Sequence, residues 1–337
     1  MIPIWLLPVF LRLIIGHVLQ AALIKKITGQ HSRTSRFLLT YLFCSAIGVI
    51  SALIFGQLAL DRVVMIVMII GFFNAIAAYA HWVASDISMS RASLYLVFDD
   101  VLAMALGYYI LSEAKFLNNG LSAGASVSLV TALFFMMYRN KKAELEAKLE
   151  AVKIGVELPD QALGAAKEKL LLKCVIYFSV TWGIAMFSMK YFGAQDVPPL
   201  KYIWAWYSGS LIGAIVVFVY SKTPIKDLRS FFAIEKIFYY KKIDEQEDEV
   251  LSLSPQAKSI LQIFLLSVSM VSSLWASYWA YQAAHLIIIQ PTFLVMEMIA
   301  PTLIGLYYFK EIKELDANEK TILVIGMLSG MLIAFNS

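Results

Sequence analysis

Four ionisable residues occur near the middle of long apolar stretches of the sequence: Arg12, Asp99, Asp100 and Glu297. A charged side chain at the centre of a lipid bilayer costs about 2.5 to 3.5 kcal/mol on insertion scales, so each should face the interior of a helical bundle. In such a place an arginine attracts a carboxylate or phosphate, and a buried carboxylate binds a cation or exchanges a proton. The alternative is that these residues form structural ion pairs or hydrogen bonds between helices.

Helical spacing indicates which residues share a helical face with each acid. Tyr95 precedes Asp99 by four residues, and Gln290 precedes Glu297 by seven, so each shares a helical face with its acid. Asp100 lies about 100° round the helix from Asp99, and the two side chains therefore point in different directions. Because Asp99 and Glu297 also occupy matching places in the repeat described below, we expect them to be two versions of one ionisable position.

Two tryptophans, Trp182 and Trp275, lie deep enough in their apolar stretches to line a site, whereas tryptophan near the end of a span is ordinarily an interfacial anchor. His17, Asn74 and His81 are interpreted as packing or interface groups. The candidate residues for substrate binding or coupling are therefore Arg12, Tyr95, Asp99, Asp100, Trp182, Trp275, Gln290 and Glu297.

Composition places these residues in a membrane. Apolar residues make up 60% of the sequence and charged residues 15%, which is typical of a chain made mostly of bilayer-spanning segments. About 20 apolar residues in a helix cross the hydrocarbon layer. We expect an all-α integral membrane protein with about ten transmembrane helices. The predicted spans are 2–24, 37–60, 63–84, 92–111, 121–138, 170–189, 202–220, 260–281, 286–309 and 321–335.

The distribution of Lys and Arg predicts the orientation. With ten spans, the connections that fall on one side include both long loops, 139–169 and 221–258, and carry most of the basic residues. The positive-inside rule places this side in the cytoplasm and both termini outside, in a bacterial-type inner (plasma) membrane. Cys44 and Cys174 lie within spans, where a thiol is usually a packing residue, so no disulfide or metal framework is expected.

The two long loops differ in composition. Residues 142–153 are rich in helix formers with opposite charges at helical spacing, so the fifth span should continue as a helix into the cytoplasm. The loop 221–258 interleaves aromatic residues such as Phe231 and Phe238 with basic residues such as Arg229, which suits a helix lying in the headgroup interface.

The sequence contains an internal repeat with an offset of about 198 residues, on which Asp99 aligns with Glu297. We therefore expect a five-helix repeat over 1–138, a cytoplasmic helical linker over 139–169, and a second five-helix repeat over 170–337. Aligned residues are identical at several positions of the two repeats. They are Leu96, Val97, Gly107, Tyr109 and Glu113 in the first repeat, and Leu294, Val295, Gly305, Tyr307 and Glu311 in the second.

Both repeats also carry glycines and an acid near their last spans. These residues are Gly107 and Glu113 in the first repeat, and Pro301, Gly305, Glu311 or Glu314, Gly326 and Gly330 in the second. The pattern resembles that of the drug/metabolite transporter superfamily, the EamA-like permeases. The resemblance implies that the two repeats have inverted topology around a central substrate cavity, which the fourth and ninth helices face.

The function expected on these grounds is a secondary transporter that moves a small organic solute across the membrane by alternating access, with proton coupling through the buried acids. The alternative is a polytopic membrane scaffold that binds a partner through its basic loops. The sequence shows no motif for an intramembrane enzyme, and neither a cofactor nor a metal is expected. The expected partners are the solute and the lipid bilayer, without nucleic acid, and the Gly326-x-x-x-Gly330 face would allow a homodimer.

Overall fold

We analysed a computed structural model of the 337-residue chain. The residues that it describes are 4–27, 32–88, 92, 97–116, 119–154, 163–232, 238–242, 249–290, 292–293, 303–308, 310–313 and 315–336.

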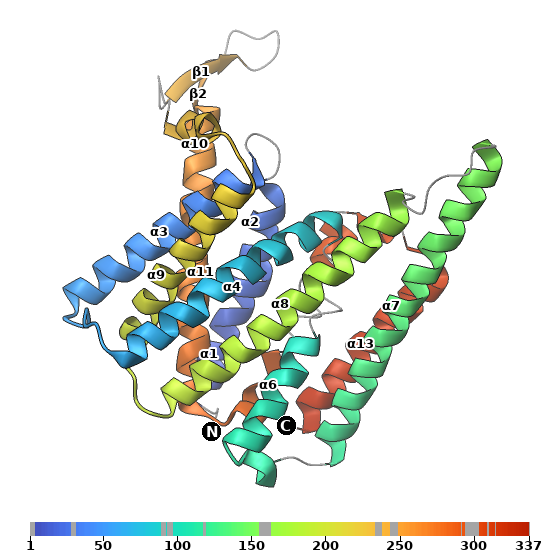
Figure 1. Ribbon diagram of the computed structural model, residues 1–337, viewed down its shortest axis with the longest axis horizontal. Helices are drawn as coiled ribbons and strands as arrows, with labels where there is room; N and C mark the ends of the chain where they lie inside the picture. Colours follow the sequence, from blue (N-terminus) through green and yellow to red (C-terminus); the bar gives the residue numbers. More distant parts are fainter. Residues whose placement is uncertain are drawn as a thin grey trace. The chain divides into compact units, whose positions relative to one another are not determined.

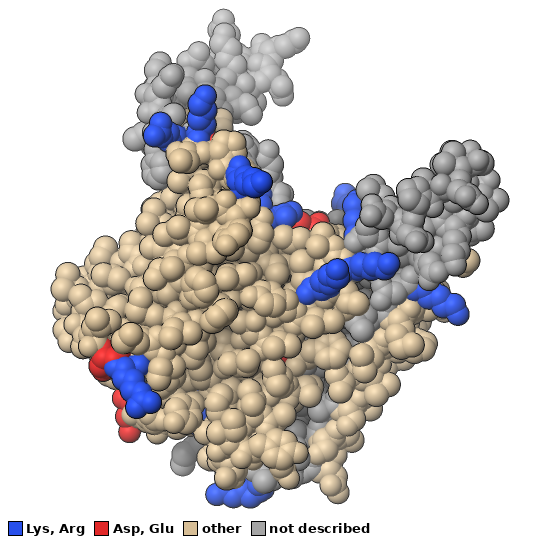
Figure 2. All heavy atoms as spheres, viewed as in Figure 1, with Lys and Arg blue, Asp and Glu red and all other residues tan. Residues whose placement is uncertain are grey.

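Six helices within these ranges are long and apolar enough to cross a membrane: Leu6–Ile24, Arg33–Ile54, Arg62–Ile87, Lys169–Gly193, Pro199–Tyr220 and Pro255–Ala283. They coincide with the first, second, third, sixth, seventh and eighth predicted spans. Most of the described surface in Figure 2 carries neither basic nor acidic residues, as lipid contact requires. The structure therefore confirms a helical protein with several membrane-compatible helices.

The first span is divided into α1 (Leu6–Arg12), a π-helix η1 (Leu13–Gln20) and α2 (Ala21–Lys26) (Figure 1). A shorter helix lies within the fourth span, and longer helices cover the fifth and tenth. The further elements are α3 (Arg33–Ile54), α4 (Arg62–Ile87), α6 (Val97–Ile110), η2 (Glu113–Phe116), α7 (Asn119–Ile154), α8 (Leu163–Gly193), α9 (Pro199–Tyr220), α10 (Ile225–Phe232), β1 (Phe238–Lys242), β2 (Glu249–Leu253), α11 (Pro255–Ala283), η3 (Ile304–Tyr308), η4 (Glu311–Lys313) and α13 (Ala317–Asn336).

The loop 221–258 corrects one expectation. The interleaved aromatic and basic residues predicted an interfacial helix, but the described residues between α9 and α11 are helical only in α10. Strands β1 and β2 then pair in an antiparallel hairpin, with Phe238 opposite Leu253. Aromatic and β-branched residues such as Tyr239, Tyr240 and Val250 favour strands, and a short apolar run does not by its period distinguish a strand from a helix.

The chain forms two compact units, of which the smaller contains Leu23–Ala75 and Leu200–Ser272. Glycines bring α4 and α9 into backbone contact within it. A Cβ atom on Gly209 would lie 1.9 Å from the carbonyl oxygen of Met68, and a Cβ atom on Gly71 would lie 2.2 Å from that of Trp206. The hydroxyl of Ser210 donates a 3.0 Å hydrogen bond to the carbonyl oxygen of Gly71. Only glycine permits this approach at the two positions.

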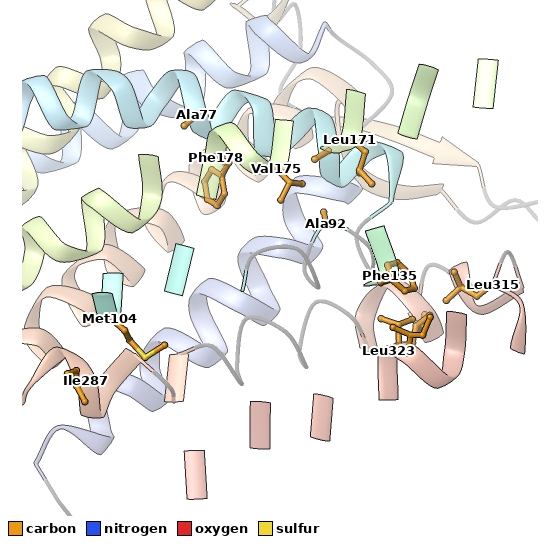
Figure 3. Packing of buried hydrophobic residues seen from close by; sticks show 13 residues of the cluster. Ala77, Ala92, Met104, Phe135, Leu171, Val175, Phe178, Ile287, Leu315 and Leu323 are labelled. Carbon is orange, nitrogen blue, oxygen red and sulfur yellow. The ribbon is translucent and has the colours of Figure 1, made fainter. Parts of the chain in front are cut away.

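The larger unit contains Met1–Ala22, Ile76–Pro199 and Ser273–Ser337. Helix α6 packs against α8, and α7 packs against α13 (Figure 1). Apolar side chains from these helices, including Met104, Phe135, Val175 and Leu323, form its buried core (Figure 3). Gly183 permits the close approach of α8 to α6, because a Cβ atom there would lie 2.8 Å from the carbonyl oxygen of Asp99.

A polar junction joins the part of α7 that extends beyond the fifth predicted span to the start of α13 in the larger unit. Asp316 and Glu319 form a capping box, in which the backbone N–H of each donates to the carboxylate of the other at 2.7 and 2.9 Å. Lys142 Nζ donates to Asp316 at 2.6 Å and to Glu319 at 3.2 Å. The hydrogen bond from Lys142 and that from the Glu319 backbone N–H lower the pKa of Asp316 to about 2.

Two of the four divisions between the units fall at nearly matching places in the predicted repeats, whereas the other two, after residues 22 and 199, are 177 positions apart and do not match. The matching divisions fall between residues 75 and 76 in α4 and between residues 272 and 273 in α11, 197 positions apart. This separation nearly equals the offset of about 198 residues that aligns Asp99 with Glu297 in the sequence. Helices α4 and α11 therefore contribute to both units in the same way.

Candidate functional site

Arg12 lies at the end of α1, and its side chain is buried, with 2% of its surface exposed. Its Nη1 donates a 2.7 Å hydrogen bond to the hydroxyl of Ser277 in α11. The guanidinium carbon lies 4.1 Å from the ring centre of Phe293 and 6.0 Å from that of Trp182 in α8. These contacts are of the cation–π type, which is strengthened when the cation is removed from water.

The π-helix η1 brings His17 to Arg12. Backbone bonds from i to i+5 widen each turn, so that residues five apart lie on one face. Accordingly, Nε of Arg12 donates a 3.2 Å hydrogen bond to Nε2 of His17. The Nε2 atom must accept this bond, since arginine only donates, and the imidazole is therefore neutral with its proton on Nδ1. Gly16 lets η1 approach α11, because a Cβ atom there would lie 2.5 Å from the hydroxyl of Ser273.

A stack of rings stands beside this pair. The imidazole of His81 in α4 lies 4.5 Å from the ring of Phe178 at an interplanar angle of 22°. The ring of Phe178 lies 5.8 Å from that of Trp182 at 13°. His17, His81 and Trp182 keep accessible surface, whereas Phe178 and Phe293 are buried. We call Arg12, His17, His81, Phe178, Trp182, Ser277 and Phe293 the Arg12 cluster.

A second group of polar side chains surrounds Gln290. Its Nε2 donates hydrogen bonds to Oδ1 of Asp100 in α6 and, at 3.1 Å, to the sulfur of Met186 in α8. Its Oε1 accepts a 2.8 Å hydrogen bond from the hydroxyl of Tyr281 in α11. We call Asp100, Met186, Tyr281 and Gln290 the Asp100 network. Asp100, Tyr281 and Gln290 are fully buried, so hydrogen bonding takes the place of hydration there.

The network lies one helical turn from the cluster. Trp182 and Met186 are four residues apart in α8, and Ser277 and Tyr281 are four apart in α11. One turn of helix rises about 5.4 Å. The rings of Tyr281 and Phe293 meet edge to face at 5.6 Å and so connect the two groups. A basic layer thus lies next to an acidic one inside the larger unit.

Asp99 was expected to be the more important of the two adjacent acids, whereas Asp100 is the one whose contact with another helix is described. The carboxylate of Asp99 is fully buried and accepts a 3.0 Å hydrogen bond from the backbone N–H of Asp100. Gln290 was grouped with Glu297 by helical phase, and the structure shows it hydrogen-bonded to Asp100. Tyr95 and Glu297 lie outside the described residues.

The two predicted tryptophans have different surroundings. Trp182 belongs to the Arg12 cluster, with its ring centre 6.0 Å from the guanidinium carbon. Trp275 is 40% exposed, and its ring lies 5.3 Å from that of Trp279 in the same helix. The described contacts of Trp275 are therefore on the surface of α11.

Sequence reasoning missed several members of the Arg12 cluster. His17 and His81 were assigned to packing, and Phe178, Ser277 and Phe293 were not selected. A signal existed for Phe178, which precedes Trp182 by four residues on one helical face. The partnership of Arg12 with His17 had no such signal, since spacing of five indicates a common face only in a π-helix.

Glu113, which matches the acid of the family pattern, has a capping role. It is buried and accepts hydrogen bonds from the backbone N–H groups of Leu286 at 3.3 Å and Ile287 at 3.1 Å. His285 Nδ1 lies 3.3 Å from the same carboxylate. Nearby, Lys190 Nζ donates to carbonyl oxygens at the end of α11. Charged side chains thus satisfy the backbone groups between α11 and the following helix.

Among the described residues, no group of three or more His, Cys, Asp and Glu side chains could hold a metal ion.

Comparison with known proteins supports the fold. No family model and no curated protein matches the sequence. A solved structure titled only "Crystal structure of protein" is similar over 98% of this chain and 95% of its own, with 12% identity and a TM-score of 0.57. At this identity the similarity concerns the fold alone, and the arrangement of nearly the whole chain is thus one that also occurs in a solved structure.

Proposed function

We propose that the chain is a secondary transporter that moves a small organic solute across a membrane by alternating access. The observation that carries this proposal is the Arg12 cluster, which places a buried cation and polar rings inside a unit built of apolar helices. Such groups are expensive in a bilayer and are retained where they bind a solute or an ion.

The cluster contains residues from both predicted repeats, and this supports transport. Arg12, His17 and His81 belong to the first predicted repeat, and the other members belong to the second. Sites between two repeats are typical of transporters, because movement of one repeat against the other opens the site to each side in turn. His81 in α4 and Ser277 in α11 also lie close to equivalent positions. His81 is six residues beyond Ala75, where the first unit boundary falls in α4, and Ser277 is five residues beyond Ser272, where the boundary falls in α11.

The accessible surface of three side chains of the Arg12 cluster is a second support for the transport proposal. The imidazoles of His17 and His81 retain accessible surface, although Arg12 beside them is buried. Trp182 does so as well. In the proposed transporter a solute contacts this surface, whereas a membrane scaffold has no use for accessible polar groups there.

We extend the proposal to ten transmembrane helices in two inverted five-helix repeats, as in EamA-like permeases. The matching division of α4 and α11 supports the repeats. In this architecture the buried acids next to the Arg12 cluster would couple transport to protons. Asp100 joins Asp99 and Glu297 as a candidate, because its contact with Gln290 connects α6 to the ninth predicted span, in which Glu297 occurs.

Cysteine accessibility tests the proposal without knowledge of the solute. In a Cys44→Ala, Cys174→Ala background, His81→Cys and Trp182→Cys should react with a membrane-impermeant thiol reagent added to either side of reconstituted vesicles. Ala205→Cys, at a fully buried position of α9, is the control and should stay unlabelled from both sides. A scaffold without alternating access would leave the His81 and Trp182 sites unlabelled, or labelled from one side only.

A further inference from the structure

We infer that Glu113 holds a gate closed at one end of the larger unit, an inference that rests on the proposed transport function. The gate consists of Gly107 and Glu113 from the first predicted repeat and of His285, Leu286 and Ile287 from the second. In alternating access, the two repeats separate at one end of the site while they meet at the other. The contacts of Glu113 are contacts between the two repeats, and they close this end.

The carboxylate of Glu113 connects the repeats by hydrogen bonds. It accepts from the backbone N–H groups of Leu286 at 3.3 Å and Ile287 at 3.1 Å, and Nδ1 of His285 lies 3.3 Å from it. Among the described residues, the partners of Glu113 thus all lie 172 to 174 positions later in the sequence. Hydrogen bonds to an ionised carboxylate are roughly twice as strong as neutral ones, so a single side chain holds the two repeats together firmly.

This cap differs from the usual cap of a helix, which comes from a residue directly before the first turn. The helical turn after α11 begins at Leu286, and the two residues before it, Ala284 and His285, are not of the types that commonly form an N-cap. Glu113 supplies the acceptor from the other predicted repeat. The backbone N–H groups of Leu286 and Ile287 therefore keep this partner only while the repeats are in contact.

Apolar packing seals the gate around the carboxylate. Leu286 and Ile287 are buried, and a Cβ atom on Gly107 would lie 2.7 Å from Cδ2 of Leu286, so α6 approaches the second repeat closely. The side chain of Glu113 is 5% exposed, whereas that of His285 is 47% exposed. Glu113 therefore lies just inside the protein surface. Water can replace its partners when the repeats separate, which keeps the cost of opening low.

Lys190 holds the other side of the same corner within the second repeat. Its Nζ donates to the carbonyl oxygens of Tyr281 at 3.0 Å and Ala284 at 2.7 Å. Helices α8 and α11 both belong to the second predicted repeat, so these bonds persist when the repeats separate. The corner after α11 is thus fixed in its own repeat by Lys190 and bound to the first repeat by Glu113.

The turn that carries Glu113 has a counterpart in the second repeat. Ser112 and Lys310 both have a left-handed backbone, with φ of 56° and 61°, which is uncommon for residues other than glycine. They are 198 positions apart, which is the offset of the predicted repeat. A 3₁₀-helix follows each of them, η2 from Glu113 and η4 from Glu311. The residue that matches Glu113 is therefore Glu311 and not Glu314, and the recurrence supports a role of this turn in both repeats.

A cross-link tests whether this end is closed, and it needs no solute. Cβ atoms at positions 107 and 286 would lie 3.5 Å apart, which fits a disulfide bond. In the full chain with Cys44→Ala and Cys174→Ala, the pair Gly107→Cys and Leu286→Cys should therefore cross-link readily under mild oxidation. Unfolding temperatures in detergent show that each variant is folded.

The role of Glu113 is tested in the same cross-linking assay. Glu113→Gln keeps the volume of the side chain but replaces the carboxylate, and it should slow the cross-linking at least about threefold. Asp196→Asn is the matched control, since it removes an exposed carboxylate just after α8 without touching the gate. It should leave the cross-linking rate unchanged.

Labelling tests whether the contact is a gate. In reconstituted vesicles, Lys115→Cys, at an exposed position of η2, identifies the side on which the gate lies. His81→Cys without the cysteine pair should react with a membrane-impermeant thiol reagent from both sides. Once the pair is cross-linked, His81→Cys should react only from the side opposite Lys115→Cys.

The effect of Glu113→Gln on labelling separates a gate from a purely structural cap. The change should speed labelling of His81→Cys from the Lys115 side and slow it from the other side, so that the ratio of the two rates shifts at least about threefold. A structural cap would change both rates in the same direction, because its loss loosens the whole protein. Asp196→Asn should leave the ratio unchanged.

Several results would overturn the inference. Failure of the pair to cross-link, or equal rates with and without Glu113→Gln, would show that Glu113 does not hold this end closed. Labelling of the cross-linked protein from the Lys115 side would show that this end is not a gate, and an unshifted ratio would leave Glu113 a structural cap. Failure of the transport proposal is a distinct result, in which His81→Cys stays unlabelled from one side even without the cross-link.

Discussion

Nε of Arg12 donates a 3.2 Å hydrogen bond to Nε2 of His17, five residues further along the chain. In an α-helix these two side chains would point in directions about 140° apart, since each residue turns by about 100°. The π-helix η1 removes this difference, and π-helical segments occur frequently at functional sites. The backbone of the first span is thus adapted to present Arg12 and His17 together to α8, α11 and Phe293.

The contact between Arg12 and Ser277 should contribute to stability. Ser277→Ala removes an acceptor at 2.7 Å from a buried charged donor, and we expect a loss of about 1.5 to 3 kcal/mol in the free energy of unfolding. Ser269→Ala, in the same helix, is the matched control, because its hydroxyl donates to the carbonyl oxygen of Leu266 within α11. Denaturation in detergent measures both. Equal losses would show that the bond to Arg12 has no stabilising effect.

Gln290 and Asp100 should be energetically coupled. Gln290→Leu removes a donor from the fully buried carboxylate of Asp100, and Asp100→Leu removes the acceptor from Gln290. Each single change should destabilise the protein, and the double change should cost less than the sum by about 0.5 to 3 kcal/mol. Unfolding free energies of the four proteins in a double-mutant cycle give this difference directly. Strict additivity would mean that the two side chains do not interact in solution.

The contact between α4 and α9 should not tolerate a methyl group at Gly209. The new Cβ atom would lie 1.9 Å from the carbonyl oxygen of Met68, so the helices must separate. We expect Gly209→Ala to cost about 1 to 3 kcal/mol or more, as overpacking does. Gly193→Ala is the control, since the nearest atom there belongs to the flexible side chain of Gln282 at 3.1 Å. An unfolding temperature of Gly209→Ala equal to that of the control would contradict the contact.

The junction between α7 and α13 predicts that the free energy of unfolding decreases at acidic pH. Hydrogen bonds from Lys142 and from the Glu319 backbone lower the pKa of Asp316 to about 2 in the folded protein, below its ordinary value of 3.8. A lowered folded-state pKa means that the stabilisation is complete above the unfolded-state value and is lost as the pH falls from about 4 to about 2.

Asp316→Asn should therefore reduce stability at neutral pH and remove part of the pH dependence between about pH 4 and pH 2. The loss should stay below about 1 kcal/mol, because the side chain of Asp316 is 34% exposed and water screens the pair. Lys142→Gln should act like Asp316→Asn, and Lys141→Gln, at the exposed neighbour, should not. Identical acid unfolding curves for Asp316→Asn and the unmodified protein would exclude a contribution from this junction.

The sequence by itself determined the helical, membrane-compatible class and the burial of Arg12, Asp99, Asp100 and Gln290, because a charged or polar side chain in an apolar span has to avoid lipid. The sequence also predicted Trp182 as a candidate site residue, and the structure places its ring beside Arg12. Periodicity did not distinguish helix from strand in the short aromatic runs of the loop 221–258, where a hairpin follows α10.

Only the tertiary structure decided which side chains meet. Helical phase predicts the face of a helix but neither its neighbours nor a change to π-helical turns, so the contacts of Arg12 with His17 and Ser277 were not foreseeable. Helical phase placed Gln290 and Glu297 on one face, but it could not predict the hydrogen bond between Gln290 and Asp100 of another helix. These contacts depend on close helix packing at residues such as Gly16 and Gly183, which brings segments distant in sequence within hydrogen-bonding range.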